Sequence, residues 1–228
     1  MLTIILPTYN ERDNIEASVN RIVQSGIDAH ILIIDDNSPD GTWKIAKKIK
    51  KYNKNVSVVR RDFERGLGSA IKLGLTTSDG IIGVMDADLS HDPSILPHIA
   101  KKFEEGADFV IGSRYIHGGG VDEWGFYRRV ISKIATFMVR PITHVKDPLS
   151  GYFFVKKSVV NSLEINPESC KICLDILVRG NYKKVCEIPY LFVNRRFGKS
   201  KILNSSQILK YMKYVVYLYY FRLKKCIS

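Results

Sequence analysis

Short apolar runs alternate with helical patterns along the first half of the chain, and this alternation limits the possible folds more than any other feature. Strand-like runs lie at residues 3–6, 31–34, 56–60, 81–85 and 109–112. Amphipathic helical patterns separate them, at residues 15–23, 41–52, 68–76 and 93–105. Strands that are apolar along their whole length and alternate with helices indicate a mostly parallel sheet covered on both faces. The sequence therefore predicts an α/β fold with a Rossmann-like, mostly parallel sheet flanked by helices.

The second half of the chain has a less regular pattern, which begins after the glycines at 118–120. The expected elements are helices at 126–140, 168–179 and 205–225, and strands at 151–155 and 185–193, the last interrupted by Pro189. A chain of 228 residues is long enough for one domain with a sizeable core and short for two. We therefore expect one domain over residues 1–204 and a C-terminal helix over 205–228.

Four of the predicted strands end in polar clusters, which locate the expected ligand site. The clusters lie at residues 7–11, 35–40, 86–92 and 113–115. In α/β proteins the carboxyl ends of the strands lie along the crevice that binds the ligand. We therefore expect the four clusters to meet at one edge of the sheet.

The third of these clusters is acidic and indicates a metal site. Asp86, Asp88 and Asp92 follow an apolar run within seven residues, and their charges repel at pH 7, so a positive partner is expected. Mg²⁺ typically takes one or two protein carboxylates together with phosphate oxygens of a substrate. Asp86 and Asp88 would then share one ion with a diphosphate. The alternative is an aspartate-rich loop that caps the helix starting near Pro93.

The cluster after the second strand begins with a pair of acids, Asp35 and Asp36. Turn and cap chemistry at Ser38 or Asp40 would explain the start of the next helix but not the acidic pair. A carboxylate at such a strand end can accept hydrogen bonds from a ribose hydroxyl or a nucleobase N–H. This pair therefore predicts a nucleotide contact.

The cluster after the first strand offers an aromatic ring and a further acid. Tyr9 could stack on a base, and Glu11 could reach a ribose or a base. The alternative is that this segment caps a helix near Asn14.

An arginine and a serine lie at the start of the predicted helix at 126–140. Arg128 and Ser132 are four residues apart and share one helix face. Near a helix N-terminus such a pair suits a phosphate group. The alternative is a solvated basic stripe.

Net charge is +12, and most of the excess lies at the C-terminal end. Residues 188–228 contain nine Lys or Arg and no Asp or Glu. Such a segment favours phosphates, which a nucleic acid, an anionic membrane or a phosphorylated ligand would present. The apolar run at 215–221 is far shorter than the roughly 20 residues of a membrane-spanning helix, and the N-terminus lacks the pattern of a signal peptide. The four cysteines are expected to be reduced.

Taken in order, the motifs resemble those of dolichol-phosphate mannose synthases, which are family-two glycosyltransferases with the GT-A fold. The resemblance covers about residues 2–205 and rests on the segments LPTYNERDNI, IIDDNSPDGT, RGLGSAIKLGL, MDADLSHDP, IGSRYIHGGGV, RRVISK, DPLSGYFFVKK and EIPYLFVNRRFGKSK. It implies inverting transfer of mannose from GDP-mannose to dolichyl or another polyprenyl phosphate, with Mg²⁺ or Mn²⁺ as the metal. The lipid monophosphate is already largely anionic at pH 7, so it can attack the sugar without a protein base.

The resemblance also implies a set of site residues. The nucleotide of the donor would contact Pro7, Tyr9, Glu11, Ile34 and Asp36. Metal and diphosphate would be held by Asp86, Ala87 and Asp88, with Ser90 as a further metal ligand. The acceptor phosphate would be held by Arg114, Arg128 and Ser132. A mobile segment carrying Arg195 and Lys201 would close over the donor, and the catalytic residues would be Asp88, Arg114 and Arg128.

The expected partners follow from the resemblance and from the basic tail. Tyr211, Tyr214, Tyr217 and Tyr220 lie on an apolar stretch flanked by lysines, a pattern typical of a membrane interface. We expect peripheral attachment to the cytoplasmic face of a membrane, and small membrane subunits assist some members of the family. The alternative for this helix is a core-packing element with a solvated basic side.

Two other functions remain open from the sequence. One is a glucosyltransferase that uses UDP-glucose and the same kind of lipid phosphate. The other is a non-catalytic basic module that binds nucleic acid or membrane. The acids at the strand ends disfavour nucleic acid, because they would repel phosphates unless a metal were bound.

Overall fold

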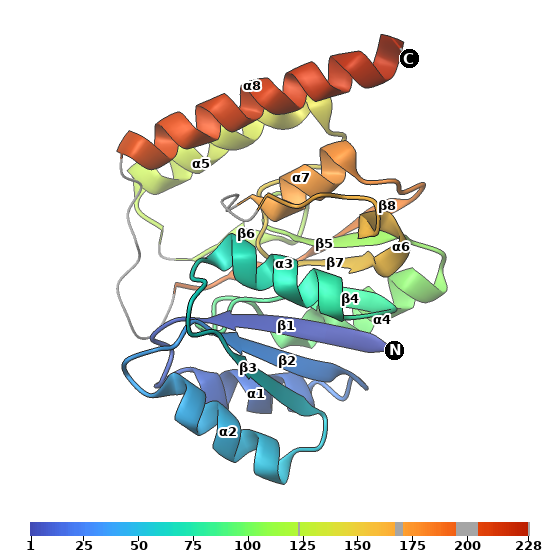
Figure 1. Cartoon of the computed structure of the whole chain (residues 1–228). Helices are drawn as coiled ribbons and strands as arrows, with labels where there is room; N and C mark the ends of the chain where they lie inside the picture. The colour runs from blue at the N-terminus through green and yellow to red at the C-terminus, as the bar shows by residue number, and fades with distance from the viewer. Residues whose placement is uncertain (123, 167–170, 195–204, 228) are drawn as a thin grey trace.

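The computed structural model describes residues 1–122, 124–166, 171–194 and 205–227. Its central sheet has seven strands in the order β3-β2-β1-β4-β7-β5-β8 (Figure 1). The strands are β1 (Leu2–Thr8), β2 (His30–Asp35), β3 (Val56–Arg60), β4 (Ile81–Val84), β5 (Phe109–Ser113), β7 (Phe153–Lys156) and β8 (Val185–Pro189). β7 is antiparallel to its neighbours β4 and β5, and the other pairs are parallel. The prediction of a mostly parallel sheet is confirmed.

Helices cover both faces of this sheet. One face carries α1 (Ile15–Gln24), α2 (Thr42–Tyr52), the short 3₁₀ helix η1 (Pro93–Ile95) and α4 (Leu96–Glu104). The other face carries α3 (Leu67–Thr77), α6 (Lys157–Val160) and α7 (Ile172–Arg179). α5 (Phe126–Val139), the 3₁₀ turn η2 (Arg140–Ile142) and α8 (Ser205–Ile227) form an outer layer against α7, with α5 and α8 side by side (Figure 1).

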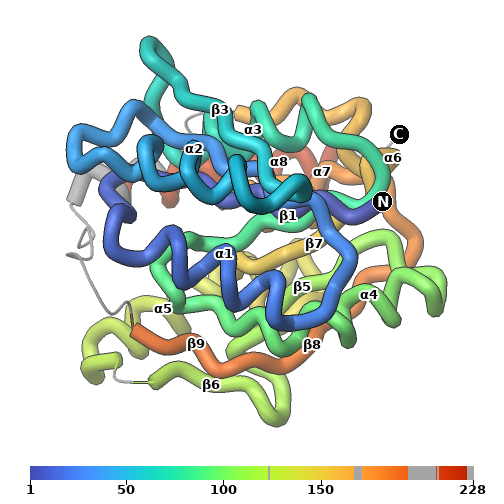
Figure 2. Tube along the Cα trace, turned by 90° about the horizontal axis from the view of Figure 1, so that it is seen from below, coloured from blue at the N-terminus to red at the C-terminus, as the bar shows by residue number. Residues whose placement is uncertain are grey.

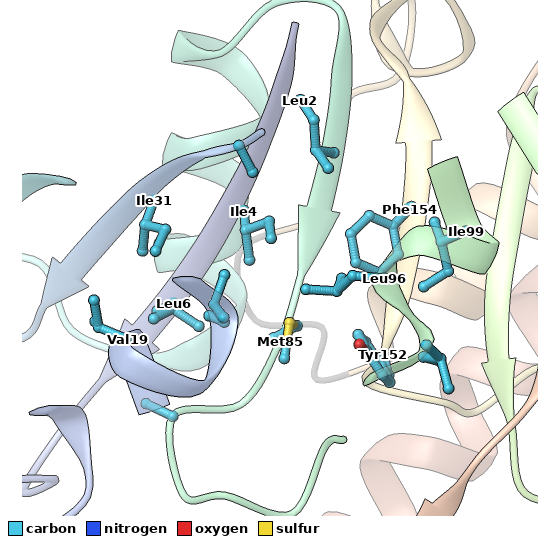
Figure 3. Close-up of a cluster of buried hydrophobic side chains, with 14 of the residues drawn as sticks. Leu2, Ile4, Leu6, Val19, Ile31, Met85, Leu96, Ile99, Tyr152 and Phe154 are labelled. Carbon is cyan, nitrogen blue, oxygen red and sulfur yellow. The ribbon is translucent and has the colours of Figure 1, made fainter. Parts of the chain in front are cut away.

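The alternation of side chains along the strands explains the two buried layers. In β1, Ile4 and Leu6 pack toward α1 and α4, whereas Ile5 packs toward α3. All three side chains have no exposed surface. Figure 3 shows the first layer, in which Ile4 and Leu6 lie among side chains from β2, α1, α4 and β7. A strand buried on both faces reads as a continuous apolar run, which is the pattern in the sequence.

The last predicted strand, at 185–193, is divided at the proline. β8 ends at Pro189, which has no backbone N–H to donate. The chain then forms β9 (Leu191–Phe192), which pairs with β6 (Gly120–Val121) in a separate two-stranded parallel sheet. β6 and α6 were not predicted, because two and four residues are too few to show a period. The predicted helix at 168–179 is α7, which begins at Ile172; residues 168–170 lie outside the described residues.

The C-terminal helix α8 packs on the rest of the protein. Val215 and Leu218 are buried against Val139 of α5 and Leu174 of α7. The hydroxyl of Tyr211 donates to the carbonyl of Ala135 at 2.8 Å. One side of α8 therefore belongs to the core, which agrees with the alternative prediction of a core-packing helix. Within the described part of the chain, no helix combines the length and apolar character that a membrane crossing requires.

Candidate functional site

The ends of the parallel strands bring several of the predicted site residues to one edge of the sheet. Pro7 in β1 lies opposite Ile34 in β2 in the strand register, and Thr8 lies opposite Asp35. The loops after β1, β2 and β4 leave the sheet at this edge (Figure 2). The edge therefore has the position of the ligand crevice of open α/β sheets.

Asp35 has a structural part at this edge. Its carboxylate accepts hydrogen bonds from the hydroxyl of Thr8 at 3.0 Å and from the backbone and hydroxyl of Ser38 at 2.9 and 2.6 Å. The hydroxyl of Ser38 in turn accepts the backbone N–H of Asn10 at 3.0 Å. Asp35 thus ties the loop after β1 to the loop after β2. The start of α2 is stabilised by Asp40, whose carboxylate accepts the backbone N–H of Thr42 at 2.9 Å.

Asp36 forms a buried ion pair that the sequence did not indicate. Its Oδ1 accepts two hydrogen bonds from the guanidinium of Arg61, one of them from Nε at 2.7 Å. Its Oδ2 accepts the backbone N–H of Gly66 at 2.7 Å. Arg61 also donates to the hydroxyl of Ser69 at 2.8 Å. Asp36 therefore fixes the loop between β3 and α3 against the end of β2, next to the predicted nucleotide position.

Tyr9 and Glu11 lie directly after β1. The side chain of Tyr9 is 40% exposed, so its ring is accessible to a ligand. Glu11 accepts a hydrogen bond from the amide of Asn14 at 2.7 Å. Asn14 occupies the N-cap position of α1, but its side chain makes no cap hydrogen bond. Glu11 therefore contacts the residue that precedes α1 through its side chain and its backbone carbonyl, and its contact with a nucleotide stays a prediction.

The three carboxylates of the acidic loop after β4 differ in exposure and in hydrogen bonding. The side chain of Asp86 is 40% exposed, whereas Asp88 is buried and its Oδ1 accepts the backbone N–H of Ser90 at 3.1 Å. Asp92 caps η1, because its carboxylate accepts the backbone N–H of Ser94 at 3.0 Å. Helix capping thus accounts for Asp92 but not for Asp86 and Asp88.

A divalent cation suits the donor atoms of this loop. Two carboxylates one residue apart offer hard oxygen ligands, and Mg²⁺ completes such a pair with phosphate oxygens and water. The hydroxyl of Ser90 is buried and has no hydrogen-bond partner among the described residues. Among the same residues there is no group of three or more His, Cys, Asp or Glu side chains that could hold an ion alone. The site therefore suits an ion shared with a substrate.

His91 is a part of the site for which the sequence indicated no function. Its Nδ1 accepts the backbone N–H of Asp86 at 3.0 Å, and its Nε2 lies 3.7 Å from the carboxylate of Asp86. The ring stacks on Tyr152 with 4.7 Å between centroids. Burial, opposed in part by the negative charge of Asp88, lowers the pKa of His91 to about 4. His91 is therefore neutral at pH 7 and holds Asp86 in place.

Arg114, at the end of β5, is held by a buried carboxylate. Its Nε and Nη2 donate to the two oxygens of Asp147, both at 2.7 Å. Burial alone would lower the pKa of the Arg114 guanidinium, but the hydrogen bonds and charge of Asp147 more than offset it and raise the pKa above its ordinary value. Arg114 therefore stays charged.

The structure brings Arg114 together with Arg128 and Ser132. Both guanidinium groups lie over the ring of Trp124, Arg114 at 5.5 Å and Arg128 at 4.2 Å from its centroid. The hydroxyl of Tyr115, the residue after Arg114, forms a 2.7 Å hydrogen bond with the hydroxyl of Ser132. Trp124 thus joins the two arginines of the predicted phosphate-binding trio, and Tyr115 links Ser132 to the residue after Arg114. Trp124 and Tyr115 were missed, although aromatic residues beside arginines are a readable signal.

The segment with Arg195 and Lys201 lies outside the described residues. The described chain stops before it at Asn194, whose side chain accepts a hydrogen bond from Arg128 at 3.1 Å.

Three residues other than glycine have a positive φ in the described chain, and all three lie in the strand-end loops. They are Asn10 at 61°, Asn37 at 52° and Leu89 at 66°. A left-handed leucine is uncommon, and such backbone conformations gather where a site requires them. Leu89 turns the chain sharply enough for the N–H of Ser90 to reach Asp88.

A mostly parallel sheet with a metal-suited acidic loop and a nucleotide-suited edge defines the class of GT-A glycosyltransferases. A mannosyltransferase from Pyrobaculum calidifontis, solved in complex with GDP-Man and Mn²⁺, is similar in structure with a TM-score of 0.63. The two sequences are 18% identical, and the match covers 87% of this chain and 58% of the other. The GT-A fold predicted from the sequence is confirmed.

Comparison of sequences gives the family. The pattern of Glycosyl transferase family 2 matches residues 3–163, and the chain belongs to this family. It is 42% identical to a dolichol-phosphate mannosyltransferase of Pyrococcus furiosus over 222 residues, which are 94% of this chain and 62% of that protein. It is 34% identical to the Saccharomyces cerevisiae protein of the same name over 235 residues, 96% of this chain and 87% of that protein. The chain thus spans less than two thirds of the Pyrococcus furiosus relative.

Proposed function

We propose that this protein transfers mannose from GDP-mannose to a polyprenyl phosphate, such as dolichyl phosphate, in a metal-dependent reaction that inverts the configuration of the sugar. The observation that carries the proposal is the placement of Arg114 and Arg128 over Trp124, with Ser132 hydrogen-bonded to Tyr115, on the same molecule as the acidic loop. Relatives at 34 and 42% identity are named dolichol-phosphate mannosyltransferases, which supports the choice of sugar and acceptor.

The chemistry follows from the acceptor. An oxygen of the lipid phosphate attacks the anomeric carbon while the bond to the departing diphosphate breaks on the opposite side, which turns an α-linked donor into a β-linked product. The phosphate is already ionised, so no protein base is required. Arg114 and Arg128 orient the acceptor and balance its charge. The donor nucleotide is bordered by Pro7, Tyr9, Glu11, Ile34 and Asp36.

Asp86 and Asp88, with Ser90 and the backbone of Ala87, would hold Mg²⁺ or Mn²⁺ against the diphosphate. When bound, the ion would neutralise the charge that develops on the leaving group. Arg195 and Lys201 would act on the same charge from the adjoining segment.

Transfer assays test the donor, the acceptor and the metal together. Purified protein is supplied with GDP-mannose or UDP-glucose, a short polyprenyl phosphate, and Mg²⁺, Mn²⁺ or EDTA. We expect a β-mannosyl phosphate product, identified by NMR, with GDP-mannose and either metal only. Glucose transfer from UDP-glucose at an equal or higher kcat/KM would contradict the proposed donor, and full activity in EDTA would contradict the metal.

We also propose that α5 and α8 attach the protein to the cytoplasmic face of a membrane as a peripheral protein. The exposed side of α5 is apolar, with Phe126, Tyr127, Ile131, Ile134 and Phe137 between 45 and 83% exposed. The exposed side of α8 carries Leu209, Met212, Val216, Tyr217, Tyr220 and Leu223. An apolar helix face turned outward is unusual unless it has a partner, and it suits the boundary between headgroups and acyl chains.

Exposed cations border these two faces. Lys133 on α5, Arg140 in η2, and Lys213 and Lys224 on α8 are exposed. Each cation near an anionic surface contributes about 1 kcal/mol of attraction, which salt weakens. The proposal thus extends the expected membrane contact from the tail to α5. Tyr211 lies on the packed side of α8, because its hydroxyl donates to the carbonyl of Ala135. We propose small membrane subunits as a further partner of this surface.

Sedimentation with anionic liposomes tests the attachment. The variant Lys133→Glu with Lys213→Glu should bind liposomes at least tenfold more weakly than the wild type, because two attractions become repulsions. The control Lys48→Glu with Lys51→Glu makes the same charge change on exposed positions of α2, on the opposite side of the sheet (Figure 1). Equal losses in both double variants, or no loss in the first, would contradict this orientation.

A further inference from the structure

The carboxylate of Asp147 is fully buried, and both of its oxygens accept hydrogen bonds from Arg114. Nε of Arg114 donates to Oδ2 and Nη2 donates to Oδ1, both at 2.7 Å. The backbone N–H of Arg114 donates to the same Oδ2 at 2.9 Å. Asp147 has no exposed surface, and the Arg114 side chain is 9% exposed. A two-point contact of this kind fixes the plane of a guanidinium as well as its position.

Asp147 is itself held by Glu187. Oε1 of Glu187 accepts the backbone N–H of Asp147 at 3.0 Å, and Oε2 accepts the backbone N–H of Lys146 at 2.8 Å. Glu187 lies in β8, and its register partner Ile111 lies in β5, three residues before Arg114. The loop that carries Asp147 is therefore fastened to the sheet strand next to the one that carries Arg114.

This arrangement leaves one edge of the Arg114 guanidinium for a ligand. Nη1 makes no hydrogen bond to any of the described residues, whereas Nε and Nη2 are occupied by Asp147. The same guanidinium lies over Trp124, on whose ring Arg128 also lies. Since Asp147 balances the charge of Arg114, the net positive charge beside Trp124 comes from Arg128.

We propose that Asp147 is a positioning residue, which holds Arg114 by one edge so that Nη1 points to the acceptor phosphate, and that Glu187 secures Asp147 for this purpose. The inference rests on the proposed function, because it takes the phosphate beside Arg114 and Arg128 to be that of the acceptor. Asp147 acts through Arg114 and does not touch the phosphate.

The proposal predicts opposite effects of one substitution in two backgrounds. Asp147→Asn removes a negative charge close to the phosphate, which by itself would tighten phosphate binding. In the wild type it also releases Arg114, and the loss of an oriented charge-assisted hydrogen bond should weaken binding about tenfold in net effect. In the Arg114→Ala background there is no guanidinium to release. There, Asp147→Asn should leave binding unchanged or make it tighter.

Binding of farnesyl monophosphate provides the readout, and it does not depend on which sugar is transferred. The protein contains two tryptophans, Trp43 and Trp124, so the full chain with Trp43→Phe reports changes around Trp124 by fluorescence. Asp108→Asn is the matched control. Asp108 pairs with Lys156 at 2.9 Å and accepts the backbone N–H of Lys183 at 2.9 Å, but it lies just before β5, at the other end of that strand from Arg114.

The outcomes separate the possible explanations. Weaker binding in the wild-type background with equal or tighter binding in the Arg114→Ala background supports the proposal. Equal weakening in both backgrounds would mean structural damage, and tightening in both would mean charge alone, so either result overturns it. Absence of farnesyl monophosphate binding by the unsubstituted protein also overturns it. Binding without mannose transfer would contradict the proposed function and leave the inference standing.

A second variant keeps the test informative where Asp147→Asn fails to fold. The variant is Glu187→Gln. Glu187 is less buried than Asp147, and the one remaining side-chain oxygen of Gln can still accept one of the two backbone hydrogen bonds. It should weaken binding in the same way, by a smaller factor, in the wild-type background only. Measured in the two backgrounds, it supports or overturns the proposal by the same comparison.

Discussion

His91 should make the stability of this protein depend on pH in a range that can be worked out from the structure. Its ordinary pKa is 6.5, and burial lowers the pKa to about 4 in the folded protein. Above pH 6.5 the side chain is neutral in both the folded and the unfolded chain. As the pH falls below 6.5 the unfolded chain binds a proton first, so the free energy of unfolding decreases. The decrease ends near pH 4, where the folded protein binds the proton as well.

The size of this effect follows from the interval between the two pKa values. The interval is about 2.5, and each pKa unit corresponds to about 1.4 kcal/mol, so His91 alone should cost about 3 kcal/mol of stability between pH 7 and pH 4. The side chain of His91 is 2% exposed, so solvent does not screen the effect.

Urea unfolding of the wild type and of His91→Phe, in EDTA at pH 7, 6, 5 and 4, measures the contribution of His91 to the free energy of unfolding. Phe keeps a ring to stack on Tyr152 but cannot be protonated, so the variant should lose about 3 kcal/mol less than the wild type over this range. His98→Phe is the control, because His98 is exposed on α4. Equal pH dependence in the wild type and His91→Phe would refute the assignment of a neutral buried His91.

Three further predictions concern the metal loop, the acceptor site and α8. Asp86→Asn and Asp88→Asn should each reduce mannose transfer by at least a hundredfold in excess Mn²⁺, with unchanged circular dichroism; activity near that of the wild type in either variant would exclude a metal function for that residue. Arg128→Ala should raise the KM for polyprenyl phosphate at least tenfold and the KM for GDP-mannose less than twofold, and equal changes in both would contradict the division of the site. Leu218→Ala should lower the free energy of unfolding by about 2–5 kcal/mol in urea titrations, since Leu218 has no exposed surface, whereas a loss below 1 kcal/mol would mean that α8 is not part of the core.

The sequence predicted the elements whose signal is local. Strands such as β1 and β2 are apolar on both faces, and helices such as α1 and α2 repeat apolar residues at helical spacing, so a short window is enough to recognise each. The polar residues at the strand ends could be grouped into one site, because parallel strands place their carboxyl ends on the same edge. The contact between Pro7 and Ile34 is an example.

Pairings between distant residues could not be predicted in this way. Asp36 pairs with Arg61 across 25 positions, and Arg114 pairs with Asp147 across 33. No local pattern shows which acid meets which base. β7 adds a further difficulty, because it is antiparallel and brings its first residues, rather than its last, to the edge where the parallel strands end.

The sequence also did not predict whether the apolar face of α5 meets the core or the outside of the protein. The period of apolar residues shows that a helix has such a face, but not whether the face meets the core or the outside. In α5, Val139 is buried while Phe126, Ile134 and Phe137 are exposed. In α8 the packed side and the outer side are both apolar, so the sequence did not show which of the two meets the core.

One consequence of α5 concerns selectivity. Arg128 directly follows Tyr127, and Ser132 directly follows Ile131, so the proposed phosphate site and the outer apolar face belong to one α-helix with a pitch of about 5.4 Å. Under the proposed membrane attachment, this helix would set the depth at which an acceptor phosphate can be reached. A phosphate in free solution would lack the lipid tether that brings it to this depth, and one buried below the headgroups would be out of range. We therefore expect acceptors to be selected by the depth of their phosphate in the bilayer.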